Sequence, residues 1–539
     1  MLVRTNSTVV GDSATSAVWT LISRVTGFGR VLLIGAVLGP SYFGNLFQLA
    51  NQMPWIVFDL AIGALLGALL VPELVRHIAS GDRQRTERIA GGFLGLVLSA
   101  FTAIALLVML FSTQIASLFA ITIDDPATKE LFIETARPLL WLTAPQLVGY
   151  GIAMTGQAVQ HATGHYLVPA AASILENVTV IITLIVFAVV FGTGVGLGEL
   201  QGGEVLLLGL GSSLGVALHA LAQIVGARRV GLSIRPRWGW SDPDVRSVLR
   251  NALPTSATAL LNGMRLLIML IASNTVAGGV VAFQLALNVL NLPVALGSKP
   301  VAYALLPRLA RHFQAGEMEE FSDGYRRGVG LAALLNVPAA AAALAIGWFA
   351  AGAVAVGEMD TAEGRELLSL VLVGIAGAII GEGLQQLAVA ASYAKGDPRG
   401  PLNSVALRVL LTFFGTMLSL SLLSGAETVL GIAVSMSVAD LVASGYLHRR
   451  LSATFTPGSY GLSASVLRTT GASVVSFGIG GFVAAVVAAS GSFDAPAQRA
   501  GATLAIVGVA LIAFVTVRVQ LDDEVPSLLE QLRPGRDSR

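Results

Sequence analysis

Long apolar runs dominate the sequence, and short polar or charged stretches separate them. A run of about 20 apolar residues is long enough to cross the hydrocarbon core of a bilayer as an α-helix. The pattern predicts an all-α polytopic membrane protein with about fourteen transmembrane helices. The predicted spans are 14–38, 45–73, 88–112, 132–158, 167–191, 204–225, 248–276, 278–303, 326–347, 350–356 extended into 366–391, 402–424, 427–447, 469–490 and 500–518.

Composition supports a membrane protein. Of the 539 residues, 54% are hydrophobic and 12% are charged, and the mean hydropathy is +0.76. Soluble domains are about 25% charged, so a soluble enzyme and a disordered chain are both excluded. The absence of cysteine excludes disulfides, thiolate metal sites and cysteine nucleophiles. The first apolar run lacks the flanks of a cleaved signal, and we expect it to be helix 1 itself.

Lysine and arginine gather on one side of the predicted spans. With the N-terminus in the cytoplasm, 25 of the 33 Lys and Arg fall in cytoplasmic segments, four fall outside and four lie within helices. The cytoplasmic groups include those at 226–250, 304–327 and 391–408. Because cytoplasmic loops carry an excess of Lys and Arg, both termini are predicted to be cytoplasmic.

An internal repeat links two distant segments. Residues 70–82 read L-V-P-E-L-V-R-H-I-A-S-G-D and residues 305–317 read L-L-P-R-L-A-R-H-F-Q-A-G-E, with six of thirteen positions identical. The shift of 235 residues predicts two pseudo-symmetric lobes of six helices each, related by an axis along the membrane normal. The predicted parts are 1–230 and 231–455 for the lobes, 456–520 for two extra helices and 521–539 for a cytoplasmic tail.

Four cationic side chains lie inside predicted spans: Arg24 and Arg30 in the first helix, Arg265 in the seventh and Lys299 in the eighth. A charge at that depth is costly unless it faces a wet cavity or a partner. Arg24 and Arg30 are about 120° apart around the helix and about 9 Å apart along it, so a slanted row through Gly27 can line a broad cavity. Guanidinium groups suit phosphate. The alternatives are snorkelling for Arg24 and Lys299, and pairing with an acid for Arg30 and Arg265.

Four acids also lie inside predicted spans: Asp59, Glu176, Glu382 and Asp440. Asp59, one span away, is the expected counter-ion of the helix 1 arginines. Glu382 stands in G-E-G-L-Q-Q, between glycines and before two amides. That setting suits a proton- or cation-coupling site and equally suits a helix–helix hydrogen bond. Glu176 and Asp440 are the other candidates for ion coupling.

No motif in the sequence indicates an enzyme. There is no phosphate-binding Walker loop, no metal-ligand spacing and no serine elbow. The pair His161 and His165 is expected to be a surface feature. We therefore expect no cofactor, no metal and no nucleic-acid partner, and any transport would draw on the membrane potential or an ion gradient. Polar amides in spans are expected more often to join helices than to bind substrate: Asn177, Asn262, Asn288 and Asn291.

Several of these features together resemble one family. The first helix has the form S-R-x-x-G-x-x-R at 23–30, and V-P-E-L at 71–74 and L-L-P-R-L at 305–309 end two further helices. With the fourteen spans, they resemble the MurJ/MviN lipid II flippases of the multidrug/oligosaccharidyl-lipid/polysaccharide exporter superfamily. The resemblance implies a bacterial inner-membrane protein with an N-lobe, a C-lobe and a cationic central cavity for the pyrophosphate and headgroup. It also implies that helices 13 and 14 form a groove for the polyprenyl tail.

The resemblance carries over to some residues and fails at others. Arg24 and Arg30 match the two helix 1 arginines of that cavity. The departures are Phe58 and Asn288, which stand where arginines are expected on helices 2 and 8, and Val31 and Asn45, which stand where acids are common. We hypothesise that Arg265 and Lys299 replace the two missing cations, with Asp59 and Asn288 in the same cavity.

The sequence thus predicts a flippase that moves a polyprenyl-pyrophosphate-linked cell-wall precursor, expected to be lipid II, by alternating access. Arg24, Arg30 and Arg265 would hold the pyrophosphate. The expected partners are this precursor, membrane lipids and cell-wall synthesis proteins. The alternatives are a flippase for another lipid-linked glycan, a cation-coupled drug exporter, and a non-transporting scaffold that recruits cell-wall enzymes.

Overall fold

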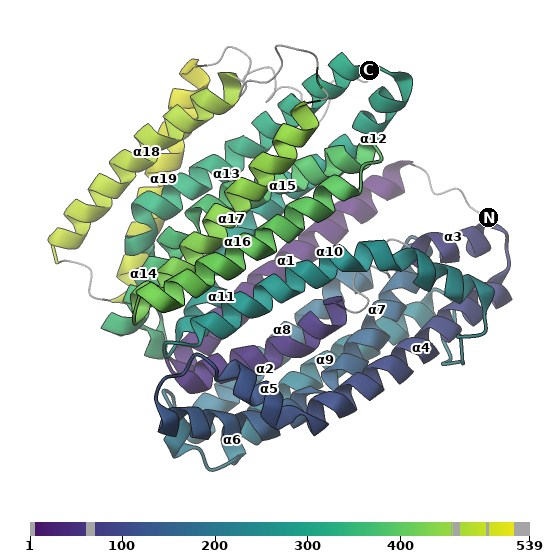
Figure 1. Ribbon diagram of the computed structural model, residues 1–539, viewed down its shortest axis with the longest axis horizontal. Helices are drawn as coiled ribbons and strands as arrows, with labels where there is room; N and C mark the ends of the chain where they lie inside the picture. The colour runs from purple at the N-terminus through teal and green to yellow at the C-terminus, as the bar shows by residue number, and fades with distance from the viewer. Residues whose placement is uncertain (1–5, 61–69, 454, 456–463, 492–494, 522–539) are drawn as a thin grey trace. The chain divides into compact units, whose positions relative to one another are not determined.

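Helices make up most of the chain in the parts that its structure, a computed structural model, describes. These parts are residues 6–60, 70–453, 455, 464–491 and 495–521, and they contain no strand (Figure 1). The chain forms two compact units, Met1–Val281 with Gly357–Met359 and Ala282–Val356 with Asp360–Arg539. The lobe boundaries predicted at 230 and 455 were placed from the sequence repeat, whereas the two units are defined by compactness. The predicted boundaries therefore stay a prediction.

The first unit is a bundle in which α8 packs against both α1 and α9, and α7 packs against both α9 and α4. Buried aromatic rings of Phe58, Phe101 and Tyr150 form part of its core, with ring centroids 5.4 Å and 6.1 Å from that of Phe58. The helices are α1 (Asn6–Leu38), α2 (Tyr42–Phe58), α3 (Val71–Ala79), α4 (Arg83–Leu110), α5 (Ser112–Phe119), α6 (Pro126–Thr143), α7 (Gln146–Ala162), α8 (Leu167–Phe191), α9 (Gly203–Arg229) and α10 (Pro243–Ser273), with short 3-10 turns η3 (Leu197–Glu199) and η5 (Gly357–Met359).

The boundary between the units falls within α11, after Val281. In the second unit, α17 packs against α15 and α16, while α18 and α19 pack against each other and against α13 (Figure 1). The helices are α11 (Gly279–Pro293), α12 (Lys299–Ala315), α13 (Met318–Val354), α14 (Ala362–Gly374), α15 (Ala376–Ala394), α16 (Arg399–Leu422), α17 (Ala426–Ser452), α18 (Ala464–Ala489) and α19 (Pro496–Leu521), with a π-helical turn η4 (Val294–Ser298).

Many of these helices can cross a membrane. Ten of the described helical stretches are long and apolar enough, or eleven when the pair α14 and α15, bent by 40°, counts as one span. A polytopic all-α membrane protein is therefore confirmed, and the predicted number of fourteen is approximate. The predicted span 45–73 includes residues 61–69, which lie outside the described residues. The predicted tenth span needs correction, because residues 350–354 belong to the end of α13 and the span consists of α14 and α15.

The repeat is visible in the backbone as well as in the sequence. Both α3 and α12 end one or two residues before a glycine, and the φ of Gly81 and of Gly316 is +76°. Glycine is favoured there because other residues meet a steric penalty at positive φ. In each copy the residue after the glycine donates its backbone N–H to the carbonyl of the repeated histidine. These bonds join Asp82 to His77 (3.1 Å) and Glu317 to His312 (2.9 Å).

Within the first unit, Asn45 on α2 holds the turn between α10 and α11. Its side-chain amide donates to Asn274 Oδ1 at 2.9 Å and to the Val276 carbonyl at 2.8 Å. Its Oδ1 accepts the backbone N–H of Val280 at 3.0 Å. That N–H belongs to the first turn of α11, where backbone donors lack a partner within the helix. The fully buried Asn45 therefore caps α11, a task for which its amide supplies both donors and an acceptor.

Candidate functional site

The first helix is packed so that Arg30 meets α8. Asn177 on α8 donates its side-chain amide to the Ser23 carbonyl and to the Thr26 hydroxyl, each at 3.2 Å. Gly27 faces the Asn177 side chain, and a Cβ there would lie 3.4 Å from its amide nitrogen, an ordinary van der Waals contact. Asn177 thus joins two helices, as its residue type predicted. Arg30, one turn further along α1, lies close to Glu176, the residue before Asn177 on α8.

Arg30 forms an ion pair with Glu176, with 3.4 Å between Nη1 and Oε1. The Tyr150 hydroxyl donates to the same oxygen at 3.1 Å, and His219 Nδ1 donates to Oε2 at 3.2 Å. Both members of the ion pair have side chains that are 15% exposed, while Tyr150 and His219 are buried. Four helices, α1, α7, α8 and α9, therefore converge on one carboxylate. We name Arg30, Tyr150, Glu176 and His219 the Glu176 cluster.

The hydrogen bonds continue beyond His219 to two amides. Gln160 Nε2 donates to Gln223 Oε1 at 2.7 Å, so the Gln223 amide nitrogen is free to donate to His219 Nε2 at 3.5 Å. Arg30 and Glu176 form the ion pair of the cluster, and His219 joins it to the Gln160–Gln223 pair.

The second unit holds a different buried ion cluster. Arg408 on α16 donates from Nε to Asp440 Oδ1 at 2.8 Å and from Nη2 to Glu382 Oε2. Gln386 donates its amide to Glu382 Oε1 at 2.7 Å. The side chains of Arg408 and Asp440 are 6% and 0% exposed. Two carboxylates share one guanidinium, so the Arg408 cluster (Glu382, Arg408 and Asp440) has a formal charge of −1 when all three groups are ionised.

The two clusters occupy corresponding helices but have opposite polarity. In the order of the predicted spans, α8 and α16 are the fifth helix of each six-helix copy, and α9 and α17 are the sixth. The fifth helix supplies the acid Glu176 in one copy and the base Arg408 in the other, and the sixth helix supplies His219 and Asp440. In the predicted duplication, each copy thus holds a buried polar cluster on its fifth and sixth helices, and the central charge of the cluster has opposite sign in the two copies.

Asp59 is not the counter-ion of Arg30, contrary to the sequence-based prediction. The carboxylate that contacts Arg30 belongs to Glu176 on α8. Asp59 follows the end of α2, where the backbone enters a π-helical turn, and its side chain is half-buried. The face of α1 that carries Gly27 and Arg30 is turned toward α8, and sequence spacing between helices does not reveal that rotation.

The other predicted site residues occupy varied environments. Arg24 is exposed, Arg265 is 5% exposed and Lys299 is half-buried. The Asn288 amide donates to the Gln284 carbonyl within α11 at 2.8 Å. Whether these residues share a cavity with Arg30 stays a prediction.

Sequence reasoning missed three members of the clusters: Tyr150, His219 and Arg408. Arg408 was assigned to the cytoplasmic segment 391–408, but α16 begins at Arg399 and buries Arg408 in its third turn. The number of cations within helices was therefore underestimated. The signal was present, because Arg408 stands in V-A-L-R-V-L-L with apolar residues on both sides. His219 stands in the same way in V-A-L-H-A-L, inside an apolar run.

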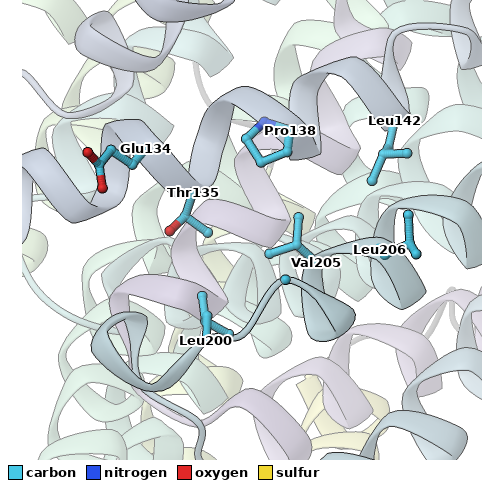
Figure 2. Close-up of a pocket in the computed structure, with 8 residues that line it drawn as sticks. Glu134, Thr135, Pro138, Leu142, Leu200, Val205 and Leu206 are labelled. Atoms are coloured by element: carbon cyan, nitrogen blue, oxygen red, sulfur yellow. The ribbon is translucent and has the colours of Figure 1, made fainter.

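A pocket of about 250 Å³ lies between α6 and the segment that leads into α9 (Figure 2). Figure 2 shows Pro138 and Leu142 on one side of it, with Leu200 and Val205 opposite. The charged residue in its lining is Glu134, and an acid offers no attraction to a pyrophosphate. The Glu176 cluster therefore remains the candidate site of the first unit.

Comparison with known proteins decides the family. The model of the family described as lipid II flippase MurJ matches residues 34–519, which is most of the chain. This chain belongs to the MurJ lipid II flippase family. The match includes Glu176, His219, Glu382 and Arg408, and it begins after Arg30.

Relatives and solved structures agree with this assignment. Probable lipid II flippases MurJ of Haemophilus influenzae and Rhizobium tropici are 27% and 25% identical over 60% of this chain. The matched regions span 63% and 59% of those relatives, so less than two thirds of their length. A solved lipid II flippase MurJ in an inward closed conformation matches 96% of the present chain and 98% of its own, with a TM-score of 0.69 and 14% identity. An inward-facing MATE family multidrug transporter of the MOP superfamily covers 81% with a TM-score of 0.62 and 17% identity. At such identities the two structures show a shared fold.

Proposed function

We propose that this MurJ-family chain is a transporter that moves lipid II, a polyprenyl-pyrophosphate-linked precursor, from the inner to the outer leaflet of the bacterial inner membrane. The observation that carries the proposal is the family match across residues 34–519. A buried guanidinium on helix 1 supports it, because an anionic headgroup that crosses a membrane needs cations at depth. The family match favours lipid II over another lipid-linked glycan and over a scaffold without transport.

The Glu176 cluster suggests how Arg30 can take up and release a phosphate. Arg30 contacts Glu176 at 3.4 Å, which is long for a charge-assisted hydrogen bond. A pyrophosphate oxygen can therefore compete for the guanidinium. Glu176 would keep its bonds from Tyr150 and His219 after Arg30 turned away. In this proposal Arg24 and Arg265 complete the pyrophosphate site.

The remaining assignments are proposals of the same kind. We propose that Glu382 and Asp440 serve in ion coupling together with Arg408, since a cluster with a formal charge of −1 attracts a proton or another cation. We propose that both termini are cytoplasmic, so that an inside-negative potential favours outward movement of the anionic headgroup. The potential contributes about 2.3 kcal/mol per elementary charge per 100 mV. We also propose that cell-wall synthesis proteins are partners of the arginine-rich cytoplasmic segments.

Depletion of the chain from its native cell tests the proposed function. Lipid II should then accumulate in the inner leaflet, because depletion removes the proposed route by which its headgroup reaches the outer face. A plasmid copy of the wild type should reverse the accumulation, and an Arg24→Ala copy should not. Leaflet distribution can be measured with a headgroup-directed reagent that does not cross the membrane. An unchanged distribution on depletion would rule out lipid II flipping by this chain.

Arg265→Ala tests whether Arg265 stands in for a missing cavity cation. Arg265 is buried on α10, and we expect its loss to abolish complementation of the depleted strain. The Arg265→Lys variant should retain part of the activity, because it keeps the charge but not the fork geometry. Growth and membrane abundance are measured together. Full growth with an Arg265→Ala variant of normal abundance would show that Arg265 does not replace a missing cavity cation.

A further inference from the structure

The segment that links α9 to α10 lies in a groove of α4 made by glycines. Arg237 donates its backbone N–H to the Gly91 carbonyl at 2.9 Å. A Cβ on Gly95 would lie 1.9 Å from the Arg237 carbonyl oxygen, and one on Gly91 would lie 2.3 Å from that of Arg235. Any larger residue at these two positions would displace the segment. We name residues 231–242 the α9–α10 strap.

Further contacts fix both ends of the strap. Leu232 and Val245 are buried in the core of the first unit, and Ile234 packs against that core. The Ser233 backbone N–H donates to the Glu87 carboxylate on α4 at 3.0 Å. The strap therefore packs against the first unit in a defined orientation, with one face toward α4 and the core and the other face exposed.

The outer face of the strap combines exposed indole rings with exposed arginines. Trp238 is 70% and Trp240 is 52% exposed, although large aromatic side chains are usually largely buried. Arg235 and Arg237 on either side of Pro236 are also exposed. Two more exposed arginines, Arg228 and Arg229, end α9 just before the strap.

The acids near the strap are mostly engaged by arginines of α4. Asp242, the last residue of the strap, and Asp244, just beyond it, are both paired with Arg85 on α4, and the Arg85–Asp242 distance is 2.8 Å. Glu87 is paired with Arg83 at 3.3 Å and also attracts Arg237, while Arg228, Arg229 and Arg235 add further positive charge. The outer face therefore keeps a strong positive charge beside two indole rings.

The position of the strap along α4 places this face at the edge of the hydrocarbon. The charged residues of α4 end at Arg88, and an apolar run extends from Ile89 to Leu110. Gly91 and Gly95 lie about 3 Å and about 9 Å beyond Ile89 along the helix axis. The strap thus crosses α4 where a membrane-spanning helix leaves the headgroup layer. Tryptophan and snorkelling arginine are the residues that favour that layer.

We propose that the α9–α10 strap is a binding site for the headgroups of anionic phospholipids, with Arg235 and Arg237 on the phosphates and Trp238 and Trp240 at the acyl-chain boundary. The occupant is the bilayer itself, because the indoles and arginines lie at its surface and their charge is complementary to it. Nothing in the proposal requires that the chain transport lipid II.

The test uses the intact chain in bilayers that contain brominated lipids. The fluorescence difference between the wild type and the Trp238→Phe/Trp240→Phe variant reports the two strap indoles. Brominated phosphatidylglycerol, titrated into phosphatidylcholine, should quench this signal at low mole fraction. The Arg235→Gln/Arg237→Gln variant should need about fivefold more phosphatidylglycerol per arginine removed, since each basic residue near an anionic surface contributes about that factor.

Control variants make each outcome decisive. The Arg308→Gln/Arg311→Gln variant removes two exposed arginines of α12 and should leave the quenching midpoint unchanged. Equal quenching by phosphatidylcholine and phosphatidylglycerol would overturn the proposal, and so would an unchanged midpoint in Arg235→Gln/Arg237→Gln. Quenching by aqueous iodide without quenching by brominated lipid would show that the strap faces water and is available to a soluble partner instead.

Discussion

Arg30→Ala is expected to abolish growth of cells that depend on this chain. The substitution removes the proposed phosphate contact and leaves Glu176 without its cation at a site that is 15% exposed. Removal of one member of a buried ion pair typically costs about 3–5 kcal/mol of stability. Both complementation and membrane abundance should therefore fall. Complementation is measured in the depleted strain, and abundance by immunoblot of the membrane fraction.

A double variant separates transport from folding in this experiment. Arg30→Gln with Glu176→Gln removes both charges and keeps amides that the Tyr150 hydroxyl can still bond. This variant should regain normal abundance but not growth. If it restores growth fully, Arg30 has only a structural role, and the proposed phosphate contact is wrong.

Arg408→Ala is expected to be the most destabilising substitution in the second unit. It leaves Glu382 and Asp440 side by side without the guanidinium that both contact. The two negative charges repel each other strongly in this buried environment. The free energy of unfolding should therefore again fall by about 3–5 kcal/mol or more. The measurement is the midpoint of thermal unfolding in detergent, followed by the loss of the monodisperse chromatographic peak.

The control for Arg408 neutralises the whole cluster. Glu382→Gln, Arg408→Leu and Asp440→Asn together should recover most of the stability, because buried ion clusters can be replaced by neutral side chains of similar volume at little cost. A flippase assay on this stable triple variant then reports ion coupling alone. If the triple variant transports at the wild-type rate and with the wild-type dependence on pH and salt, the Arg408 cluster does not take part in ion coupling.

Apolar periodicity was sufficient to predict the architecture. Runs such as 167–191 and 427–447 coincide with α8 and most of α17, because a lipid-facing helix must be apolar over its whole length. The repeat was equally readable, since Gly81 and Gly316 occupy a backbone conformation that glycine alone adopts easily. Such features depend on local sequence and can therefore be predicted without knowledge of how the helices pack.

Pairing between helices could not be read in the same way. Glu176 and Asp59 were both acids within reach of helix 1, and only the rotation of α1 against α8 selects Glu176. Arg408 was misplaced because charge counting assigns an arginine near a loop to the loop. The desolvation cost of burying Arg408 is offset by its bonds to Glu382 and Asp440, which lie 26 and 32 residues away in sequence. Tertiary contact, and not local composition, decides where such a charge can stay.

The cap that Asn45 places on α11 has an evolutionary consequence. Asn45 and Val280 are separated by 235 residues, so the repeat makes them the same position in its two copies. In a homodimer of a single six-helix ancestor, such a pair would be a residue that touches its own counterpart on the two-fold axis. A symmetric ancestor needed one residue to serve both sides of that contact. After gene fusion, one copy could keep the amide acceptor while the other kept only a backbone donor and became valine.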